Sequence, residues 1–463
     1  MFVEGSNWAE EADVVVAGWG AAGLMAALEA ADAGATVVVV ESEAEIGGST
    51  KLSGAYVALC ETPLQPGSRD ELLDDLREAH HGDAQDELSR LYVDHAADMF
   101  RRLDELGIRF VRTFQFAHMS RPWAHELSGD RMAGGAEIIE RLSAAAKERG
   151  ISIRTSTAAQ RLVVEDGRVA GLRIRRDDSV QDLRARRGVV LATGGFTRSA
   201  ELIRNFGRPG SDQILPLTGR GSRGDGLKMA MAVGAGTSYM TVGIAPTAPT
   251  DPETGKGVMV LYAGAVALNM QGVRFCRESD LYIDTCWAAL RQPGGLFVQV
   301  YDDGMRQAYG LTMMGKVLTG FREIRADTIE ELAEVLKGQG FDAEGIVASV
   351  NGYNDDVRRG VDTQFGRVGL VGEAGALLPI GAAPFYAVIC RAGTTHFNGG
   401  LTVGSDMGVR DVFGDPIAGL YAAGETTGGF HGAGYMSGTF VGMALISGRV
   451  AGRSAANAPV APA

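Results

Sequence analysis

The sequence has few of the features that mark secreted, membrane-spanning or nucleic-acid-binding proteins. Its four cysteines include no C-x-x-C pair, which excludes the usual zinc and dithiol motifs and favours free thiols in a reducing compartment. No apolar stretch of about 18 residues runs without breakers, and the N-terminus lacks the basic and apolar regions of a signal peptide. We therefore expect a cytoplasmic protein without a transmembrane segment. The net charge of −13 argues against a nucleic-acid partner.

Glycine, in contrast, is abundant, with 65 residues, about twice the usual share. Three glycines, Gly18, Gly20 and Gly23, form a G-x-G-x-x-G motif directly after the apolar segment 14–17. In this motif the first glycine permits a tight turn, the second lets a pyrophosphate approach the backbone, and the third lets a helix pack closely on the strand. The pattern predicts a strand, then a helix over about 21–33 that ends at Gly34.

An acidic residue completes this motif. A second apolar strand is expected over 36–40, and Glu41 follows it, about 20 residues after the glycines, where a carboxylate accepts ribose hydroxyls. Strand, glycines, helix, strand and acid occur in the order and spacing of a dinucleotide site. The alternative is a tight strand–helix turn that holds no ligand.

A polar, glycine-rich loop comes directly after Glu41. A loop in this place suits a flavin better than a nicotinamide, and the alternative is a cluster of surface turns. Its polar and glycine residues include Gly47, Gly48, Ser49, Thr50, Ser53 and Gly54.

The middle of the chain mixes helices and strands. Two amphipathic helices are expected over 70–107, with His80 and His81 at an exposed helix end. Asp166-Gly167 predicts a hairpin turn between two strands. The segment 188–196 reads as a buried strand that runs into Thr193-Gly194-Gly195, a second place where backbone could meet a cofactor. A last helix is expected to begin near Thr439.

The domain organisation follows from where these motifs stop and return. From about residue 227 to 382 the pattern changes, and no second G-x-G-x-x-G occurs, so a nicotinamide-binding domain is not indicated. The fold class is predicted to be α/β: a doubly wound, Rossmann-type binding domain with an inserted α+β capping domain. The expected domains are the binding domain at 1–222 and 383–463 and the capping domain at 223–382.

The motifs together resemble one family. The opening G-x-G-x-x-G with Glu41, the GGST-x-x-SGA loop, and the segments LATGGF, THFNGGL and GLYAAGE are similar to the fumarate reductase/3-ketosteroid dehydrogenase flavoproteins. The resemblance covers nearly the whole chain in the correct order and implies FAD. Some members bind flavin covalently through a histidine in the loop after the ribose acid. Residues 42–54 contain no histidine, so we expect noncovalent FAD.

The cofactor-binding residues that the resemblance implies come from six stretches of the chain. They are Gly18, Gly20, Ala22, Gly23, Glu41, Ser42, Gly48, Ser49, Thr50, Ser53, Gly54, Ala159, Ala192, Thr193, Gly194, Gly424, Glu425, Gly438, Phe440 and Val441.

Two positions depart from the fumarate reductase pattern. That subfamily has an arginine proton donor four residues after G-x-R-F-x-x-E, and here this position holds Tyr282. It has a second arginine after H-G-A-x, which clamps the substrate carboxylate, and here this position holds Tyr435. Guanidinium groups suit a dicarboxylate, whereas phenols do not. The substrate is therefore expected to be a small hydrophobic ketone.

The replacement is similar to a specific subfamily. Tyr435-Met436-Ser437-Gly438 resembles the Tyr-x-Ser-Gly of 3-ketosteroid Δ4-(5α)-dehydrogenases, in which a tyrosine at the Tyr282 position completes the set. The implied role of Tyr435 is to polarise the ketone, and that of Ser437 with Tyr282 is to accept the α-proton. The alternative is that both tyrosines are packing residues. His396 and His431 are candidates for substrate or flavin contact, or for structural hydrogen bonds.

The implied function is an FAD-dependent dehydrogenase that introduces an α,β double bond into a 3-ketosteroid or similar alicyclic ketone. Two alternatives stay open: an enone or enoate reductase that runs in the opposite direction, and a flavin electron carrier without substrate turnover. No haem motif, iron–sulfur cysteine pattern or nicotinamide domain identifies the electron acceptor.

Overall fold

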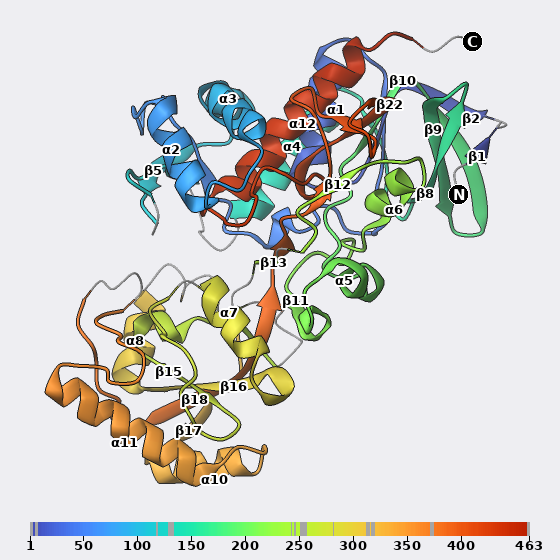
Figure 1. The fold of residues 1–463 in the computed structure, drawn as a ribbon. Helices are drawn as coiled ribbons and strands as arrows, with labels where there is room; N and C mark the ends of the chain where they lie inside the picture. The colour runs from blue at the N-terminus through green and yellow to red at the C-terminus, as the bar shows by residue number, and fades with distance from the viewer. Residues whose placement is uncertain are drawn as a thin grey trace. The chain divides into compact units, whose positions relative to one another are not determined.

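The computed structural model describes residues 3–4, 8–116, 119–127, 134–241, 243–244, 247–250, 257–280, 282–311, 315, 320–370 and 375–460. Contacts divide the chain into two units (Figure 1). Unit 1 consists of residues 1–208, 218–243 and 396–463, and unit 2 of residues 209–217 and 244–395.

A mixed sheet lies at the centre of unit 1. Its parallel part is buried on both faces, which explains why residues 14–17 and 37–40 are uninterrupted apolar runs. The parallel strands follow the order β22 (Pro416–Ala422), β10 (Ser179–Leu191), β2 (Trp8–Ala17), β3 (Val37–Val40) and β7 (Ser152–Arg154).

An antiparallel layer extends this sheet through the first half of β10. Strand β9 (Arg168–Arg176) pairs with β10 and with β8 (Ala158–Glu165). The turn between β8 and β9 is Asp166-Gly167, with φ of 50° and 74°. Two successive positive φ values match a hairpin turn whose twist suits the strands, so the predicted hairpin is confirmed.

Helices cover the sheet of unit 1. The predicted helices over about 21–33 and 70–107 and near Thr439 are all present, and Ser68 forms the capping box that opens one of them. The helices are α1 (Ala21–Asp32), α2 (Arg69–Ala79), α3 (Asp86–Glu105), α4 (Gly134–Glu148), α5 (Ala200–Phe206), α6 (Asp225–Met231) and α12 (Thr439–Asn457). Short strands complete the unit: β1 (Val3–Glu4), β4 (Val57–Ala58), β5 (Phe110–Phe114), β6 (Ala124–Leu127), β12 (Thr237–Ser238), β19 (His396–Phe397), β20 (Gly400–Leu401) and β21 (Gly408–Arg410).

Helix α12 packs directly against the backbone of α1 (Figure 1). A Cβ built on Gly448 would lie 2.3 Å from the Ala22 carbonyl oxygen, and one on Gly452 would lie 2.2 Å from the Ala26 carbonyl oxygen. Atoms cannot approach so closely, so only glycine at these positions allows the observed contact. The two glycines therefore set the distance between α1 and α12.

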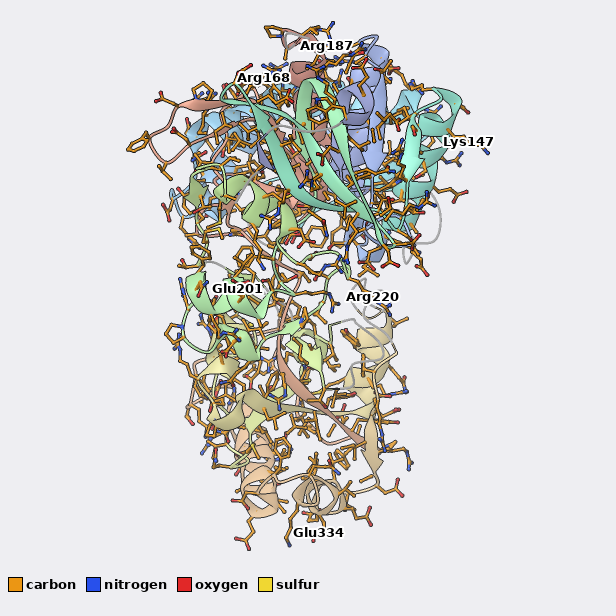
Figure 2. The ribbon with its side chains drawn as sticks, turned by 90° about the vertical axis from the view of Figure 1, so that its right-hand side faces the viewer. Lys147, Arg168, Arg187, Glu201, Arg220 and Glu334 are labelled. Carbon is orange, nitrogen blue, oxygen red and sulfur yellow. The ribbon has the colours of Figure 1, made fainter. Side chains whose placement is uncertain are left out.

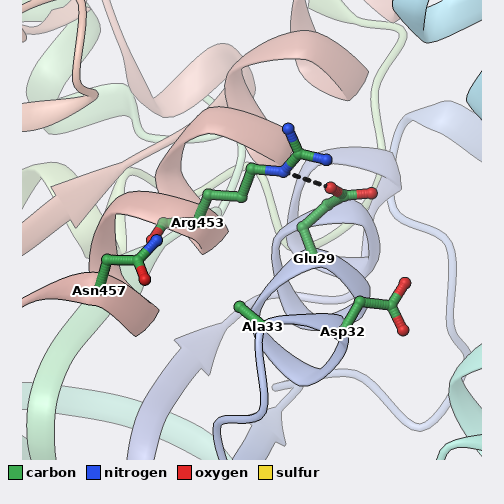
Figure 3. Close-up of a pocket in the computed structure, with 5 residues that line it drawn as sticks. All are labelled: Glu29, Asp32, Ala33, Arg453 and Asn457. Atoms are coloured by element: carbon green, nitrogen blue, oxygen red, sulfur yellow. Dashed lines mark hydrogen bonds and ion pairs between the residues drawn. The ribbon is translucent and has the colours of Figure 1, made fainter.

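A buried carboxylate ties the same helices together at their other end. Glu29 of α1 is 2% exposed and accepts from Arg102 Nε of α3 at 2.6 Å. It also accepts from Arg453 Nε of α12 at 2.7 Å, as Figure 3 shows. Removing one partner from such a network leaves a charge without compensation in a poorly solvated place. The network holds α1, whose N-terminal end carries the glycine motif.

The segment after α12 is tied to the edge of the antiparallel layer. The Arg187 guanidinium donates to the Ala458 carbonyl at 3.0 Å, and that of Arg168 donates to the Pro459 carbonyl at 3.4 Å. Figure 2 shows Arg168 and Arg187 at the same end of the layer, where the Arg168 guanidinium also donates to the Arg187 carbonyl.

Unit 2 is built on a second, mainly antiparallel sheet. Strand β18 is central and pairs with β11, β14, β16 and β17, while β15 pairs with β16. Thr328 caps α10 by accepting from the Glu331 backbone N–H at 3.1 Å. The elements are β11 (Leu215–Pro216), β14 (Thr247–Pro249), β15 (Val266–Asn269), α7 (Tyr282–Leu290), β16 (Leu296–Asp302), α8 (Asp303–Leu311), β17 (Ile324–Ala326), α10 (Ile329–Lys337), α11 (Ala343–Arg359) and β18 (Phe385–Thr394).

The fold class is the predicted one, an α/β binding domain with an inserted α+β unit, but the units divide the chain at other positions than the predicted domain borders. Residues 223–243 belong to unit 1, where β12 pairs with β20. Residues 383–395 belong to unit 2, because β18 is the strand on which that sheet is built. The division into functional domains at residues 222 and 382 stays a prediction.

Two further expectations concern the whole chain. All four cysteines are buried free thiols, as expected. Within the described residues, none of the helices combines the length and the apolarity that crossing a bilayer requires.

The contact between α1 and α12 predicts opposite effects for two glycine substitutions. Gly452→Ala places a methyl group against the α1 backbone and should lower the free energy of unfolding by about 1–3 kcal/mol. Gly352 lies in exposed helix α11, and a Cβ there meets nothing within 4 Å. Gly352→Ala should therefore stabilise the protein by about 0.5–1 kcal/mol. Urea denaturation of both variants tests this, and equal effects of the two substitutions would contradict it.

Candidate functional site

The G-x-G-x-x-G turn joins β2 to α1, and each of its glycines meets a different surrounding. Gly18 has φ of +108°, and a Cβ there would lie 2.2 Å from the Ala192 carbonyl oxygen at the end of β10. A Cβ on Gly23 would lie 2.0 Å from the Gly18 carbonyl oxygen. A Cβ on Gly20 would meet only Thr50 Oγ1, at 3.8 Å. Protein atoms thus explain the first and third glycines, whereas the second leaves bare backbone beside open space.

The N-terminal end of α1 offers backbone donors at this turn. No side chain caps the helix at Gly20, and the Ala21 N–H reaches Thr50 Oγ1 only at 3.3 Å. The first N–H groups of a helix have no partner within the helix, and together with the helix dipole they favour an anion. The turn therefore has the backbone arrangement that a phosphate requires.

Glu41 follows β3 and is 9% exposed. Its Oε2 accepts from the Trp19 backbone N–H and its Oε1 from the Glu43 backbone N–H, both at 2.9 Å. The carboxylate therefore holds the residue between Gly18 and Gly20 in place. A carboxylate has about four acceptor positions, so it retains capacity for a ligand hydroxyl, and the predicted ribose contact stays a prediction.

The loop after Glu41 is bound to another segment of unit 1. Ser49 Oγ accepts from the Gly219 backbone N–H at 3.1 Å and lies 3.3 Å from Ser222 Oγ. A Cβ on Gly219 would lie 2.8 Å from the backbone of Gly48. The two backbones therefore touch, so the glycine-rich loop is fixed by contacts distant in sequence.

Glu425 lies in the short helix over Gly424–Thr426, after β22. Burial raises the pKa of its carboxyl group to about 7, and hydrogen bonds from the Gly195 and Phe397 backbone lower it in part. Its Oε1 has no partner in the described part of the chain. A buried acceptor without a partner is costly, which makes Glu425 a candidate ligand contact, as its motif implies.

Tyr435 stands in a cluster of rings at the start of α12. Its ring centroid is 5.4 Å from that of His396, 5.7 Å from that of His431 and 5.3 Å from that of Phe440. Burial raises the pKa of the Tyr435 phenol to about 12, although hydrogen bonds with the Gly438 backbone and Ser437 side chain act in the opposite direction. The phenol therefore stays protonated at neutral pH and can donate a hydrogen bond.

Two histidines of this cluster are uncharged at neutral pH. Burial lowers the pKa of His396 and of His431 well below the usual value. His431 is 5% exposed, and neither of its ring nitrogens has a partner within the residues described. A neutral imidazole offers one donor and one acceptor, so His431 has unused capacity to bind a polar group.

A third histidine is buried, contrary to the prediction. His80, expected at an exposed helix end, is 0% exposed, and its ring contacts His431 edge-on with centroids 5.7 Å apart. Burial lowers its pKa to about 4. The sequence did contain a signal, because position 80 continues the apolar stripe of Leu72 and Leu76 at helical spacing. The polar residue type hid this pattern.

Tyr282 belongs to unit 2, at the first position of α7, where its backbone N–H donates to Tyr262 Oη at 2.8 Å. Nearby in sequence, Arg274 and Glu278 are fully enclosed and form a bidentate ion pair, with Asp362 as a second bidentate partner. Their side chains are 1% and 0% exposed. These charges thus hold unit 2 together.

The predicted cofactor residues all lie in unit 1. They occupy the β2–α1 turn, the end of β3 and its loop, strand β8, the end of β10, the segment after β22 and the start of α12. Two residues near Tyr435 were not predicted as site residues: His80, whose ring contacts His431, and Asn398, which is hydrogen-bonded to the loop before Tyr435.

Comparison with known proteins gives a family and several relatives. The model of the FAD binding domain family matches residues 13–441. An NADH:fumarate oxidoreductase of Klebsiella pneumoniae is 31% identical over 91% of this chain, but the chain spans only 45% of that protein's length. A probable fumarate reductase of Shewanella frigidimarina is 31% identical over 90% of this chain and 70% of its own. A 4-oxocyclohexanecarboxylate 2-dehydrogenase of Sinomonas cyclohexanicum is 28% identical over 90% of this chain and 87% of its own.

Solved structures share the fold. The open conformation of a flavocytochrome c3 fumarate reductase matches with a TM-score of 0.87 and 29% identity, over 97% of this chain and 79% of that one. A 3-ketosteroid-Δ4-(5α)-dehydrogenase of Rhodococcus jostii, in complex with 4-androstene-3,17-dione, matches with a TM-score of 0.74 and 28% identity, over 97% of this chain and 98% of that one.

The residues of unit 1 fit FAD. The open backbone at Gly20 and the uncapped start of α1 suit a pyrophosphate, the buried Glu41 suits a ribose, and Glu425 has an acceptor oxygen without a partner. Gly438 caps α12 with φ of +86° and no side-chain hydrogen bond, and the positive end of the helix dipole there favours electron-rich ligand oxygens.

Glu425 predicts a pH dependence of stability. The pKa of its carboxyl group is about 7 in the folded protein, against an ordinary value of 4.5. Between these values the folded state binds more protons than the unfolded state, so Glu425 makes the free energy of unfolding fall as pH rises from about 4.5 to about 7. Glu425→Gln should remove this loss, and its advantage over wild type should grow across that window, by at most about 3 kcal/mol.

Urea denaturation of the FAD-free protein at several pH values measures this difference. Glu78→Gln, at an exposed site on α2, serves as the control. A constant difference between Glu425→Gln and wild type from pH 4.5 to pH 8 would show that the carboxyl group is not shifted.

Proposed function

This chain belongs to the family of proteins with an FAD binding domain, and on that premise we propose that it is a dehydrogenase that introduces an α,β double bond into a 3-ketosteroid or similar alicyclic ketone. Its family and relatives make it an FAD-dependent oxidoreductase. The proposal concerns the substrate and the direction. The observation that carries it is Tyr435, a protonated phenol among neutral imidazoles.

The mode of FAD binding is the first part of the proposal. Residues 42–54, which the resemblance identifies as the place of a covalent histidine, contain none. We infer that FAD is held without a covalent bond, and acid precipitation should then leave a yellow supernatant. Flavin fluorescence that stays with the denatured chain on a gel would contradict this.

Tyr435 decides the substrate class in this proposal. A guanidinium at this position would bind a carboxylate, whereas a phenol with a raised pKa donates one hydrogen bond to a neutral carbonyl oxygen. A substrate carboxylate placed beside neutral His396 and His431 would have no charge partner there. Two relatives are named for cyclic ketones, the Sinomonas dehydrogenase and the Rhodococcus steroid enzyme.

The reaction divides into two hydrogen transfers. Tyr435 donates to the ketone oxygen and stabilises the negative charge that forms there when the α-carbon loses its proton. Ser437 together with Tyr282 accepts that proton, because a serine alone is too weak a base. FAD, when bound, supplies the acceptor for the hydride that leaves the β-carbon. The carbon–carbon double bond forms from the electron pair of the broken α C–H bond.

An enone or enoate reductase is the second candidate, because the relatives at 31% identity are fumarate reductases. The same residues would then donate a proton to the α-carbon, and the electrons would flow from reduced flavin. A flavin electron carrier is a third possibility. The electron partner in all three cases is unassigned.

Anaerobic flavin bleaching separates these functions. The oxidised holoenzyme should lose its yellow colour with a saturated 3-ketosteroid or a simpler alicyclic ketone. The chemically reduced enzyme should not be reoxidised quickly by fumarate under argon, since tyrosines stand at both arginine positions. Reoxidation by an enone without bleaching by any ketone would favour the reductase, and no response to either would favour the carrier.

Single substitutions test the roles of the three residues. Tyr435→Phe keeps the ring and removes one hydrogen bond to the developing charge, so flavin reduction in a single turnover should slow by about 10²–10³-fold. Ser437→Ala and Tyr282→Phe should each slow it by roughly 10²–10⁴-fold, and their double variant should be far from additive. The FAD content should be normal in all of them. Rates within about threefold of wild type would identify packing residues instead.

A further inference from the structure

Asn398 is enclosed in the turn between β19 and β20 and touches the loop that carries Tyr435. It is 2% exposed. Its Nδ2 donates to the Gly432 carbonyl and to the Gly434 carbonyl, each at 3.0 Å. Both neighbours are acceptors only, so the orientation of the amide is fixed: the reversed amide would place its oxygen against two carbonyl oxygens. One side chain thus bridges two peptide groups of the same loop.

The same loop is confined from another direction by the end of α2. A Cβ on Gly432, which has φ of +53°, would lie 1.6 Å from the Asp83 carbonyl oxygen. A Cβ on Gly434 would lie 1.8 Å from the Ala79 carbonyl oxygen. Both positions therefore require glycine, and glycine has the least conformational restriction of any residue. The loop needs external hydrogen bonds to take up one conformation.

The Gly434 carbonyl belongs to the peptide group that ends at the Tyr435 nitrogen. Because a peptide group is planar, holding this carbonyl also holds the Tyr435 N–H and the direction in which the chain enters Tyr435. The second bond, to Gly432, prevents the segment from rotating about a single contact. Asn398 therefore acts on the residue from which the phenol extends.

We propose that Asn398 is a positioning residue for the Tyr435 phenol: its two hydrogen bonds hold the His431–Tyr435 loop in the conformation from which the phenol donates to the ketone. This inference rests on the proposed function. A displacement of about 1 Å at a reacting centre can cost about 10²-fold in rate, so the loss of Asn398 should affect catalysis more than binding of the cofactor.

The first test is a double-mutant cycle on the holoenzyme. Asn398→Ala should slow single-turnover flavin reduction, per bound FAD, by about 10–10²-fold. In a Tyr435→Phe background the same substitution should change the rate by less than about threefold, because its effect passes through the phenol. Multiplicative effects in the double variant, or an Asn398→Ala rate within threefold of wild type, would overturn the proposal.

Asn354 provides a matched control. Its amide likewise bridges backbone, since Nδ2 donates to the Ile380 carbonyl and Oδ1 accepts from the Ile380 N–H, both at 2.8 Å, within unit 2. Asn354→Ala should leave the flavin reduction rate within about threefold of wild type. An equal loss in both variants would show that a general loss of stability, rather than the position of Tyr435, explains the effect.

A second readout does not depend on turnover. With 3-fluorotyrosine at position 435, the ¹⁹F resonance should shift or broaden in Asn398→Ala and stay unchanged in Asn354→Ala. An unchanged resonance in Asn398→Ala would refute the positioning role. If the resonance moves but Tyr435→Phe leaves the rate unaltered, Asn398 does position Tyr435 and the proposed function is wrong.

Asn398→Ser keeps the test decisive if the alanine variant does not fold. The shorter hydroxyl can donate to at most one of the two carbonyls. Asn398→Ser should therefore reduce flavin more slowly than wild type but faster than Tyr435→Phe. Its ¹⁹F resonance should also be shifted from the wild-type position. A serine variant identical to wild type in both measurements would also overturn the proposal.

Discussion

The site depends on direct contact between backbones, which glycine alone permits. Gly18 lies against the end of β10, Gly23 against Gly18 itself, and Gly448 and Gly452 of α12 against α1. Each contact brings a carbonyl oxygen to within about 2 Å of where a side chain would begin. Together they fix α1 relative to the sheet and to α12. They thereby fix the position of the uncapped start of α1, which includes the bare backbone of Gly20. The remaining parts of the site are attached to this frame.

Charge is handled differently in two parts of unit 1. Near the C-terminal end of α1, Glu29 accepts hydrogen bonds from arginines of α3 and α12, which is an arrangement that holds helices together. Near the start of α12, the polar groups are kept neutral: His80, His396 and His431 have lowered pKa values and Tyr435 has a raised one. Neutral donors and acceptors suit a neutral polar ligand better than an ion.

The neutral groups around Tyr435 suit the proposed ketone substrate. A carbonyl oxygen gains charge only as the reaction proceeds, so a fixed neutral donor stabilises the transition state more than the bound ketone. The proposed role of Asn398 follows from this, since a hydrogen bond from the Tyr435 phenol stabilises the developing charge only if the phenol is held in place. The ring cluster and the two hydrogen bonds from Asn398 thus act together. Gly432 and Gly434 allow the loop to pack closely, and the Asn398 amide holds it in one conformation.

Local patterns in the sequence determined several strands and four helices of unit 1, and they predicted a dinucleotide site. Apolar runs at residues 14–17 and 37–40, the spacing from Gly18 to Glu41, and the Asp166-Gly167 turn each depend on neighbouring residues only, and the structure confirms the elements they predict. The resemblance then supplied the family, which the match over residues 13–441 confirms. The roles of Tyr282, Tyr435 and Ser437 remain predictions.

Only the tertiary structure decided the burial of His80, the partners of Asn398 and the strand partners of β18, which place residues 383–395 in unit 2. Each of these depends on contacts between segments far apart in the sequence. His80 is polar and follows a helix, so local composition favours exposure, but the rings of Phe430 and His431, distant in sequence, pack against it. Asn398 reads as a turn residue, and its two acceptors lie more than 30 residues away. The physical reason is that secondary structure follows from the chain's own neighbours, whereas burial and side-chain hydrogen bonds follow from which segments the fold brings together.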